Sequence, residues 1–308
     1  MHRTEISVWT PATLANINVG FDGLGCALSG PGERLVMRRT DAVGCVNIRL
    51  IEGADLPLET SLNVAGVAAQ SLLKALGNPC GLELDIFKEI KPGSGIGSSA
   101  ASAAGAVFAL NALLNAGLSP QALLTHALDG EALASGSRHA DNVAPALMGG
   151  LVLCPPRGLP VSIPFPVDWH VVVLHPDVAI RTEDARKVLP ENVSFKDAVD
   201  QARWLGVFTA GCYQGDGALA ALALEDLLAG PHRAGLIPHF ESIRNIAMRH
   251  GAIAGGISGS GPSTFWVTLT TDDSAQVAHE LKAFMRNEGM ACDIHQTRIS
   301  ARGSRIIE

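Results

Sequence analysis

The stretch 91–101, KPGSGIGSSAA, combines residue types that suit the binding of a phosphate group. Its glycines let the backbone approach a bulky anion without a Cβ in the way, and they lead directly into a predicted helix. A helix N-terminus carries unpaired N–H groups and about half a positive charge, so it attracts anions. Ser98 and Ser99 would place hydroxyls there for a helix cap, a phosphate or a magnesium ion. The stretch therefore predicts a phosphate-binding loop.

Other interpretations of this loop are a plain glycine-rich turn with Ser98 as helix cap, or one of two better-known nucleotide loops. A Walker A loop, GxxxxGK[ST], needs a lysine after its last glycine, and none stands there. A dinucleotide-binding GxGxxG loop would follow the first strand of the chain, with an acidic residue about 20 positions further on. Neither pattern fits, so we expect a different class of phosphate loop.

Composition limits the class of protein. The chain has 308 residues, of which 47% are hydrophobic and 17% charged, so a large core is expected. A formal net charge of −7 argues against nucleic acid as a partner. The six cysteines are widely spaced and are expected to be buried free thiols in a reducing compartment. No signal peptide or apolar run of about 18 residues is present, which predicts a soluble, cytoplasmic protein without a membrane partner.

The loop must be positioned by the strand and helix on either side of it. Alternation predicts a strand at 81–90, and apolar periodicity predicts a helix at 98–116. The first half also contains predicted strands at 5–9, 34–40 and 45–53, a helix at 60–77 capped by Thr60 or Ser61, and a helix at 119–135.

A proline-rich segment, 154–169, predicts a domain boundary, which divides the chain into 1–155 and 156–308. The second half is predicted to contain strands at 170–177, 251–258, 263–269 and 292–300 and helices near 194–213, 214–229, 238–250 and 273–289. A tight GSGP turn would join the strands at 251–258 and 263–269. This order favours an α+β class, with an antiparallel sheet packed against helices.

Three stretches together resemble the three sequence motifs of the GHMP kinases, a family of small-molecule kinases. They are 10–28 (TPATLANINVGFDGLGCAL), the glycine loop, and 255–267 (GGISGSGPSTFWV). The segments 138–150, 185–190 and 231–240 resemble the members that phosphorylate L-homoserine. The resemblance runs in order from residue 10 to about 270. One departure is Lys91, which stands where the family's loop usually has a proline.

The resemblance implies two α+β domains, a ribosomal-S5-like one first and a ferredoxin-like one second. It also implies transfer of a phosphoryl group from ATP to L-homoserine, a step toward threonine. Magnesium would be held by Ser99 and Glu131. The implied nucleotide-binding residues are Lys91, Pro92, Gly93, Ser94, Gly95, Ile96, Gly97, Ser98, Ser99, Ala100 and Ala101.

Homoserine carries an ammonium, a carboxylate and a hydroxyl, and the matched positions offer a partner for each. Asn16 and Asp22 suit the ammonium and hydroxyl end, and His139 could contact either end. Arg186 and Arg233 suit the carboxylate, since a guanidinium pairs with it through two parallel hydrogen bonds. Taken alone, each arginine would be read as a surface charge.

The catalytic group is the most open point. Asp141 and Asn142 occupy the region where relatives of mevalonate kinase place a catalytic aspartate. Members that act on homoserine are thought to work without a clear base, by alignment and electrostatics. Asp141 could equally be a helix or turn cap.

Two other functions remain open: a sister kinase with a mevalonate- or shikimate-type acceptor, and a non-catalytic member of the fold. Asp22 together with two arginines favours an amino-acid acceptor over mevalonate. A non-catalytic member is expected to have lost the loop serines or Glu131, and both are present. The expected ligands are ATP, Mg²⁺ and L-homoserine. A homodimer is compatible with the sequence, which does not itself give an oligomeric state.

Overall fold

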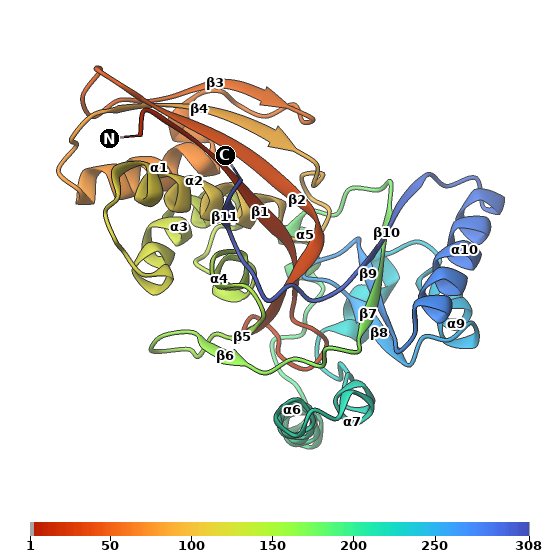
Figure 1. Ribbon diagram of the computed structural model, residues 1–308. Helices are drawn as coiled ribbons and strands as arrows, with labels where there is room; N and C mark the ends of the chain where they lie inside the picture. Colours follow the sequence, from red (N-terminus) through yellow and green to blue (C-terminus); the bar gives the residue numbers. More distant parts are fainter. Residues whose placement is uncertain (1–2, 308) are drawn as a thin grey trace.

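The computed structural model describes residues 3–307; Met1, His2 and Glu308, at the ends of the two predicted domain ranges, lie outside the described residues. Two sheets, each covered by helices, lie side by side (Figure 1). The predicted α+β class is confirmed, as is the antiparallel second sheet.

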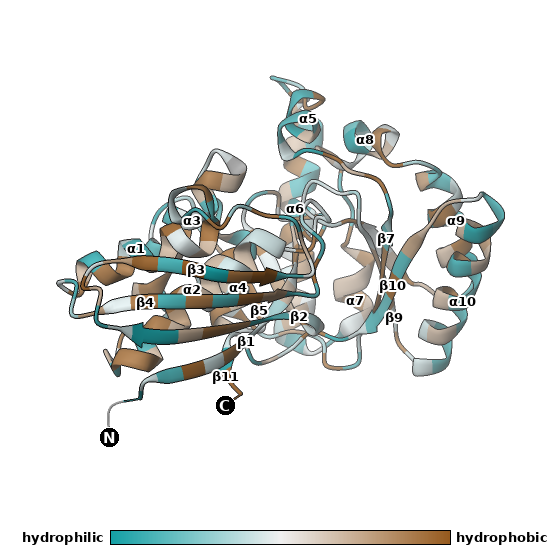
Figure 2. Ribbon diagram, turned by 90° about the horizontal axis from the view of Figure 1, so that it is seen from above, coloured by the Kyte–Doolittle hydropathy of each residue, from teal (hydrophilic) through white to brown (hydrophobic). Residues whose placement is uncertain are grey.

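The first sheet is built on four long strands. They are β1 (Glu5–Ala15), β2 (Leu24–Thr40), β3 (Val46–Glu52) and β4 (Gly81–Lys88). The order is β11-β1-β2-β4-β3, and only the β3–β4 pair among these described strands is parallel. Figure 2 shows hydrophilic and hydrophobic residues alternating along β3 and β4, the pattern of a sheet with one covered face.

Three short strands complete this sheet. The strands β5 (Leu151–Leu153) and β6 (Val161–Ile163) extend it beyond β2, and β11 (Arg305–Ile306) pairs with β1. Both β6 and β11 follow residue 155 in the chain, so the second half of the sequence contributes to the first sheet. The division of the chain at residue 155 stays a prediction.

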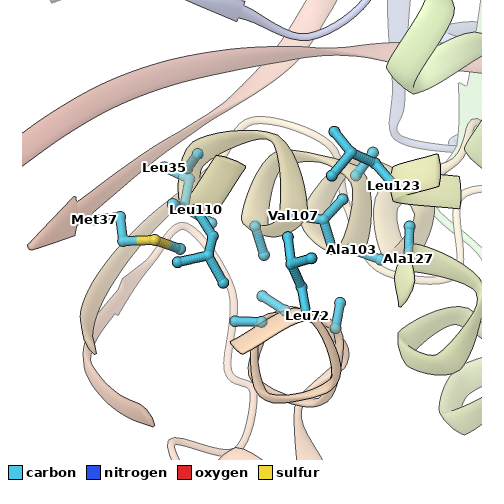
Figure 3. Packing of buried hydrophobic residues seen from close by; sticks show 14 of the residues in the cluster. Leu35, Met37, Leu72, Ala103, Val107, Leu110, Leu123 and Ala127 are labelled. Atoms are coloured by element: carbon cyan, nitrogen blue, oxygen red, sulfur yellow. The ribbon is translucent and has the colours of Figure 1, made fainter. Parts of the chain in front are cut away.

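We call the first sheet with its helices the first unit, and the second sheet with its helices the second unit. Helix α2 (Ser98–Leu114) lies at the centre of the first unit, between the sheet and two other helices. Its neighbours are α1 (Val64–Ala75) and α3 (Pro120–Ser135), and α4 (Ala140–Met148) packs on both α2 and α3. Figure 3 shows Val107 and Leu110 of α2 against Leu72 of α1. Burial of each such leucine or valine stabilises the unit by about 1.5–3 kcal/mol. Because α2 is alanine-rich and buried on nearly every side, its N-terminus is held in one place.

The second sheet has the order β10-β7-β9-β8 and is antiparallel throughout. Its strands are β7 (His170–Pro176), β8 (Ala254–Ile257), β9 (Thr264–Thr268) and β10 (Cys292–Thr297). One face packs on α9 (Phe240–Arg249) and α10 (Thr271–Asn287), and the other on α6 (Phe195–Gln214) and α7 (Gly217–Leu222). Three short helices, α5 (Thr182–Lys187), α8 (Gly230–Arg233) and the 3₁₀ turn η2 (Ala234–Leu236), lie between these elements.

Several sequence predictions of local structure were wrong. The helix predicted at 214–229 is helical only over Gly217–Leu222 before the short helix α8. The cap of the helix at 64–75 is Asn63, whose side chain accepts from the N–H groups of Ala65 and Gly66, because a 3₁₀ turn η1 (Thr60–Leu62) precedes it. The strand predicted at 5–9 continues to Ala15. The helices α4 and α5 and the first half of β2 were not predicted.

Among residues 3–307, no helix combines the length and apolar character needed to cross a membrane. All six cysteines are free thiols, as predicted, but the expectation that they are all buried was wrong: Cys45 is exposed, and Cys154 and Cys292 are partly exposed.

Candidate active site

A cavity of about 750 Å³ opens beside the glycine loop, and residues from both units line it. Fifteen of the residues selected from the sequence contribute to its wall: Asn16, Asp22, Pro92, Gly93, Ser94, Gly95, Gly97, Ser98, Ser99, Glu131, His139, Asp141, Asn142, Arg186 and Arg233. The four that do not are Lys91, Ile96, Ala100 and Ala101. Ile96 and the two alanines are buried in the core beneath the loop.

The loop owes its shape to three glycines in the left-handed region. Gly93, Gly95 and Gly97 have φ of 73°, 82° and 75°, a conformation that side chains disfavour. Gly97 is the N-cap of α2 and provides no side-chain cap, so the first-turn N–H groups of this helix are available to an anion. The interpretation of Ser98 as helix cap was therefore wrong.

The two serines of the first turn have different partners. Ser98 donates from Oγ to the carbonyl oxygen of Ile90 at 2.8 Å, which ties the helix start to the end of β4. The Ser99 hydroxyl is hydrogen-bonded to Glu131, on helix α3. Burial raises the pKa of Glu131 to about 7, against the effect of this hydrogen bond, and the charge of Asp141 adds to the rise.

The Ser99–Glu131 pair suits a magnesium ion. A carboxyl group whose ionisation is opposed by burial gains from a cation beside it. The described residues contain no cluster of three or more His, Cys, Asp or Glu suited to a metal. Magnesium does not need one, since it keeps several waters and binds through one or two protein oxygens plus phosphates.

A turn of the second unit, residues 258–263 between β8 and β9, packs against the outer side of the loop and is hydrogen-bonded to it. We call this set of contacts the clasp. Ser258 donates from Oγ to the carbonyl oxygen of Gly95 at 2.8 Å, and the N–H of Ser263 donates to that of Ser94 at 3.2 Å. The contact is close, because a Cβ on Gly95 would lie 2.6 Å from the carbonyl oxygen of Gly261. The two units therefore share the loop.

Lys91 lies on the outer side of the loop. Its ammonium pairs with Asp293 at 2.9 Å and Asp177 at 3.5 Å, and its side chain is half-exposed. Both aspartates belong to the second unit, at β10 and just after β7. The residue that departs from the family pattern thus adds another contact between the loop and the second unit.

A strained turn after β1 presents Asn16 and Asp22 to the cavity. Asn16, Ile17 and Asn18 have φ of 66°, 44° and 58°, three successive left-handed residues without a glycine. Each costs on the order of 1–3 kcal/mol unless the surroundings impose it. Here the side chain of Asn16 donates to the carbonyl oxygen of Gly259 at 2.9 Å and accepts from the N–H of Asp22 at 2.9 Å.

The charged groups predicted for an amino-acid acceptor meet in this cavity. The Asp22 carboxylate accepts two hydrogen bonds from Arg186, at 2.8 and 3.3 Å. The His139 ring contacts both residues, 3.6 Å from Asp22 and 3.0 Å from Arg186. Burial lowers the pKa of His139, which favours its neutral form. Phe21 lies beneath two guanidiniums, 5.8 Å from Arg186 and 5.0 Å from Arg233.

Arg233 is a buried cation with carbonyl partners. It is 4% exposed and donates to the carbonyl oxygens of Ala185 at 3.0 Å and Gly259 at 2.8 Å. Burial lowers the pKa of this guanidinium, and the charge of Arg186 adds to the effect. Two like charges held together in a cavity favour an anion between them.

Asp141 and Asn142 lie in the first turn of α4. Burial raises the pKa of Asp141 to about 7, and the charge of Asp22 contributes. The side-chain carbonyl of Asn142 accepts from the Thr13 hydroxyl at 2.6 Å, which fixes its orientation at the cavity wall.

Sequence reasoning missed three larger parts of the wall. The first is the segment 179–183, which leads into α5. Of the other two, one is apolar: Leu56, Pro57, Leu62, Val64 and Leu133. Leu62 and Leu133 are 56% and 45% exposed, and in the sequence they read as ordinary helix positions. The other is a polar floor that includes Lys88 and Ser102. Lys88 lies near the end of the predicted strand, in phase with Leu82, Leu84 and Ile86. Alternation therefore places it on the buried face, a signal that sequence reasoning did not use.

Comparison with known proteins agrees with this arrangement. Residues 63–150 match the GHMP kinases N terminal domain, and residues 208–287 match the GHMP kinases C terminal domain. A protein named homoserine kinase from Xanthomonas campestris pv. campestris (strain B100) is 42% identical over 98% of this chain and 94% of its own length.

Solved structures agree as well. The crystal structure of homoserine kinase from Cytophaga hutchinsonii has a TM-score of 0.94 and 35% identity, covering 100% of this chain and 98% of that one. The structure of L. major mevalonate kinase has a TM-score of 0.74, covers 96% of both chains and is 17% identical, so it shows the fold alone. With both family domains matched and relatives of this identity aligned over nearly its whole length, the chain belongs to the GHMP kinases, as a member of the group formed by the homoserine kinases.

Proposed function

We propose that the chain transfers the γ-phosphoryl group of ATP to the hydroxyl of L-homoserine, giving ADP and O-phospho-L-homoserine on the route to threonine. The full-length relatives that carry the homoserine kinase name support this reaction. The observation that carries it is Arg233, a guanidinium 4% exposed whose described hydrogen bonds all go to carbonyl oxygens, beside Arg186 in the same cavity as the phosphate loop. Such a cation is expected to bind an anionic group of the acceptor.

In this proposal the nucleotide binds along the glycine loop. As a GHMP kinase the chain uses ATP as its phosphate donor. The triphosphate would lie over Gly93–Gly97 and the N-terminus of α2, where a nest of N–H groups and the helix dipole favour negative charge. The exposed Leu62 and Leu133 would cover the adenine ring, since apolar side chains commonly line ligand pockets.

Magnesium belongs to the same proposal. Ser99 and Glu131 would hold it, because they offer a hydroxyl and a carboxylate already in contact. A bound ion would supply positive charge to offset the charge that develops during transfer.

In this proposal the acceptor is oriented by the charged side chains of the cavity. Its carboxylate would pair with Arg233 and Arg186, and its ammonium with Asp22 and the side chain of Asn16. The neutral His139 would donate or accept one further hydrogen bond. Since Asp22 and Arg186 already pair with each other, a zwitterion can exchange partners with them, and neither charge is left bare.

Transfer itself depends on alignment and electrostatic stabilisation, which are the main contributions in phosphoryl transfer. Asp141 and Asn142 are the candidates for holding the acceptor hydroxyl in line with the γ-phosphate. Asn142 is preset by Thr13, and Asp141 has a pKa near neutrality.

An acceptor panel tests the proposal. L-Homoserine would be compared with 3-aminopropan-1-ol, which lacks the carboxylate, and 4-hydroxybutanoate, which lacks the ammonium. Mevalonate and shikimate represent the sister kinases. We expect kcat/KM for homoserine to exceed that for each analogue by roughly 100-fold or more, as for a lost charge-assisted contact. A preference for mevalonate or shikimate would overturn the proposal, and no turnover of any alcohol would indicate a non-catalytic member. The predicted cytoplasmic location and homodimer stay predictions.

A further inference from the structure

Beneath the phosphate loop, a buried ion pair that the proposed reaction does not use joins β2 to β4. Lys88 Nζ lies 2.7 Å from Glu33 Oε2, and the two side chains are 2% and 1% exposed. Taking two charges out of water is costly, and apolar residues of equal size often stabilise a core as well or better. Stability alone therefore does not account for charges at this place.

Every donor of the Lys88 ammonium is used. Besides Glu33 it donates to Ser102 Oγ at 2.8 Å and to the carbonyl oxygen of Ser98 at 3.0 Å. Ser102 in turn donates to the other carboxylate oxygen of Glu33 at 2.6 Å. We call Lys88, Glu33 and Ser102 the Lys88 network. It ties two strands of the sheet to the first two turns of α2.

The network closes the base of the phosphate loop. The chain leaves the sheet at Lys88 and enters α2 at Ser98, and the Lys88 ammonium donates to the carbonyl oxygen of Ser98. A second hydrogen bond, from Ser98 Oγ to the carbonyl oxygen of Ile90, joins the same two ends. The residues between these two hydrogen-bonded ends form the glycine loop. Its ends therefore cannot shift relative to the sheet without breaking buried hydrogen bonds.

These two hydrogen bonds hold the first turn of α2 most directly. Ser99 follows the pinned Ser98 and reaches Glu131 on α3. Lys88 and Ser102 line the cavity with them.

We propose that Lys88 is a positioning residue for phosphoryl transfer, whose network holds the start of α2 so that Ser99 and Glu131 face the nucleotide phosphates. This inference rests on the proposed function. It predicts an effect on nucleotide binding and on turnover, and little effect on the acceptor, whose charged partners lie on α5, α8 and the turn after β1.

Lys88→Met together with Glu33→Leu tests it, since removing both charges avoids leaving one unpaired in the core. We expect a folded enzyme whose kcat falls roughly 30- to 300-fold while its KM for homoserine changes by less than about 3-fold. Calorimetry with a non-hydrolysable ATP analogue and magnesium should show affinity weakened by roughly 10-fold. Ser102→Ala, a milder change, should lower kcat by about 3- to 10-fold, and it carries the test if the double variant does not fold.

Arg38→Met is the matched control. It breaks another ion pair between β2 and β4, Arg38 to Asp85 at 2.6 Å, and neither residue lines the cavity. Its kcat should stay at the wild-type value. If the double variant, or Ser102→Ala in its place, keeps wild-type kcat and nucleotide affinity, the network serves the fold alone. A rise in homoserine KM at unchanged kcat overturns the inference as well. If wild-type enzyme does not phosphorylate homoserine but the variant still loses nucleotide affinity, the proposed acceptor fails and the positioning role stands.

Discussion

Arg186 holds Asp22 through two N–H···O contacts of 2.8 and 3.3 Å, although 164 positions separate the two residues. The contact joins helix α5 of the second unit to the strained turn after β1. Residues that sequence reasoning assigned to opposite ends of one ligand are thus each other's partner. In the proposed function, a zwitterionic acceptor would enter the cavity by exchange of ion pairs with these two residues.

Arg186→Leu and Arg233→Leu should each weaken binding of the acceptor and leave binding of the nucleotide unchanged. Loss of one charge-assisted contact costs roughly 2–4 kcal/mol, a rise in homoserine KM of tens to several hundredfold. The KM for ATP should change by less than about 2-fold, because the phosphate loop is untouched. Steady-state kinetics with homoserine and 3-aminopropan-1-ol measure the loss of preference. Arg203→Leu, an exposed arginine of α6 paired only with Asp200 in the structure, is the control. Two variants with unchanged preference would show that these arginines do not bind the acceptor.

Glu131→Gln should lower turnover by roughly 100-fold or more and leave the protein folded. The amide keeps the size of the carboxyl group and removes the charge that a magnesium ion needs. The measurement is kcat as a function of magnesium concentration. Asp129→Asn, on the same helix but outside the cavity, should behave as wild type. Wild-type turnover of Glu131→Gln at limiting magnesium would exclude Glu131 as a ligand.

Asp141→Asn should stabilise the magnesium-free protein at pH 8 but not at pH 4. The pKa of Asp141 rises from an ordinary 3.8 to about 7 on folding, chiefly through burial. The folded state therefore binds the proton more tightly, and its free energy of unfolding falls as the pH rises from about 4 to about 7. The amide removes this loss, a gain on the order of 1–3 kcal/mol above pH 7. Urea unfolding at several pH values measures it, and a gain of equal size at pH 4 and pH 8 would assign it to packing.

Gly95→Val and Gly93→Ala should differ sharply. At Gly95 a Cβ would meet the carbonyl oxygens of Gly261 and Ser258 at 2.6 and 2.9 Å, so the valine should disrupt the clasp of the second unit and lower Tm. At Gly93 no atom lies within 4 Å of the added Cβ, and the alanine costs only about 1 kcal/mol for its positive φ. Thermal unfolding and ATP calorimetry on both variants distinguish these effects. Equal losses of Tm would contradict the clasp.

The contacts between the turn 258–263 and the loop also change the explanation for why glycine is needed in the loop. A side chain at Gly95 or Gly97 was expected to occupy the phosphate space. Instead, the missing Cβ atoms of these residues face protein, Gly261 in one case and the Thr13 hydroxyl in the other. Only tertiary contacts reveal this, because φ > 0 and a crowded Cβ both select glycine.

The predictable part of the fold was the part with local signals. Ser119 caps its helix and alternation marks β4, as expected. The first half of β2 was missed since Gly30, Pro31 and Gly32 interrupt it in sequence while pairing with β1 sustains it in space. The site followed from motifs with charged or glycine residues. Its apolar wall carries no such signal, because leucines are ordinary at those positions. Lys88 did carry one, since it alternates in phase with Leu82, Leu84 and Ile86, but its charge did not suggest burial.

The pairing of β11 with β1 closes the first sheet with the last residues of the chain, as Val8 lies opposite Ile306 and Arg305 stacks on Trp9 at 3.9 Å. During synthesis, the first unit must therefore wait for the whole second unit to leave the ribosome before its edge is covered. Until then β1 offers an unpaired strand edge to other chains.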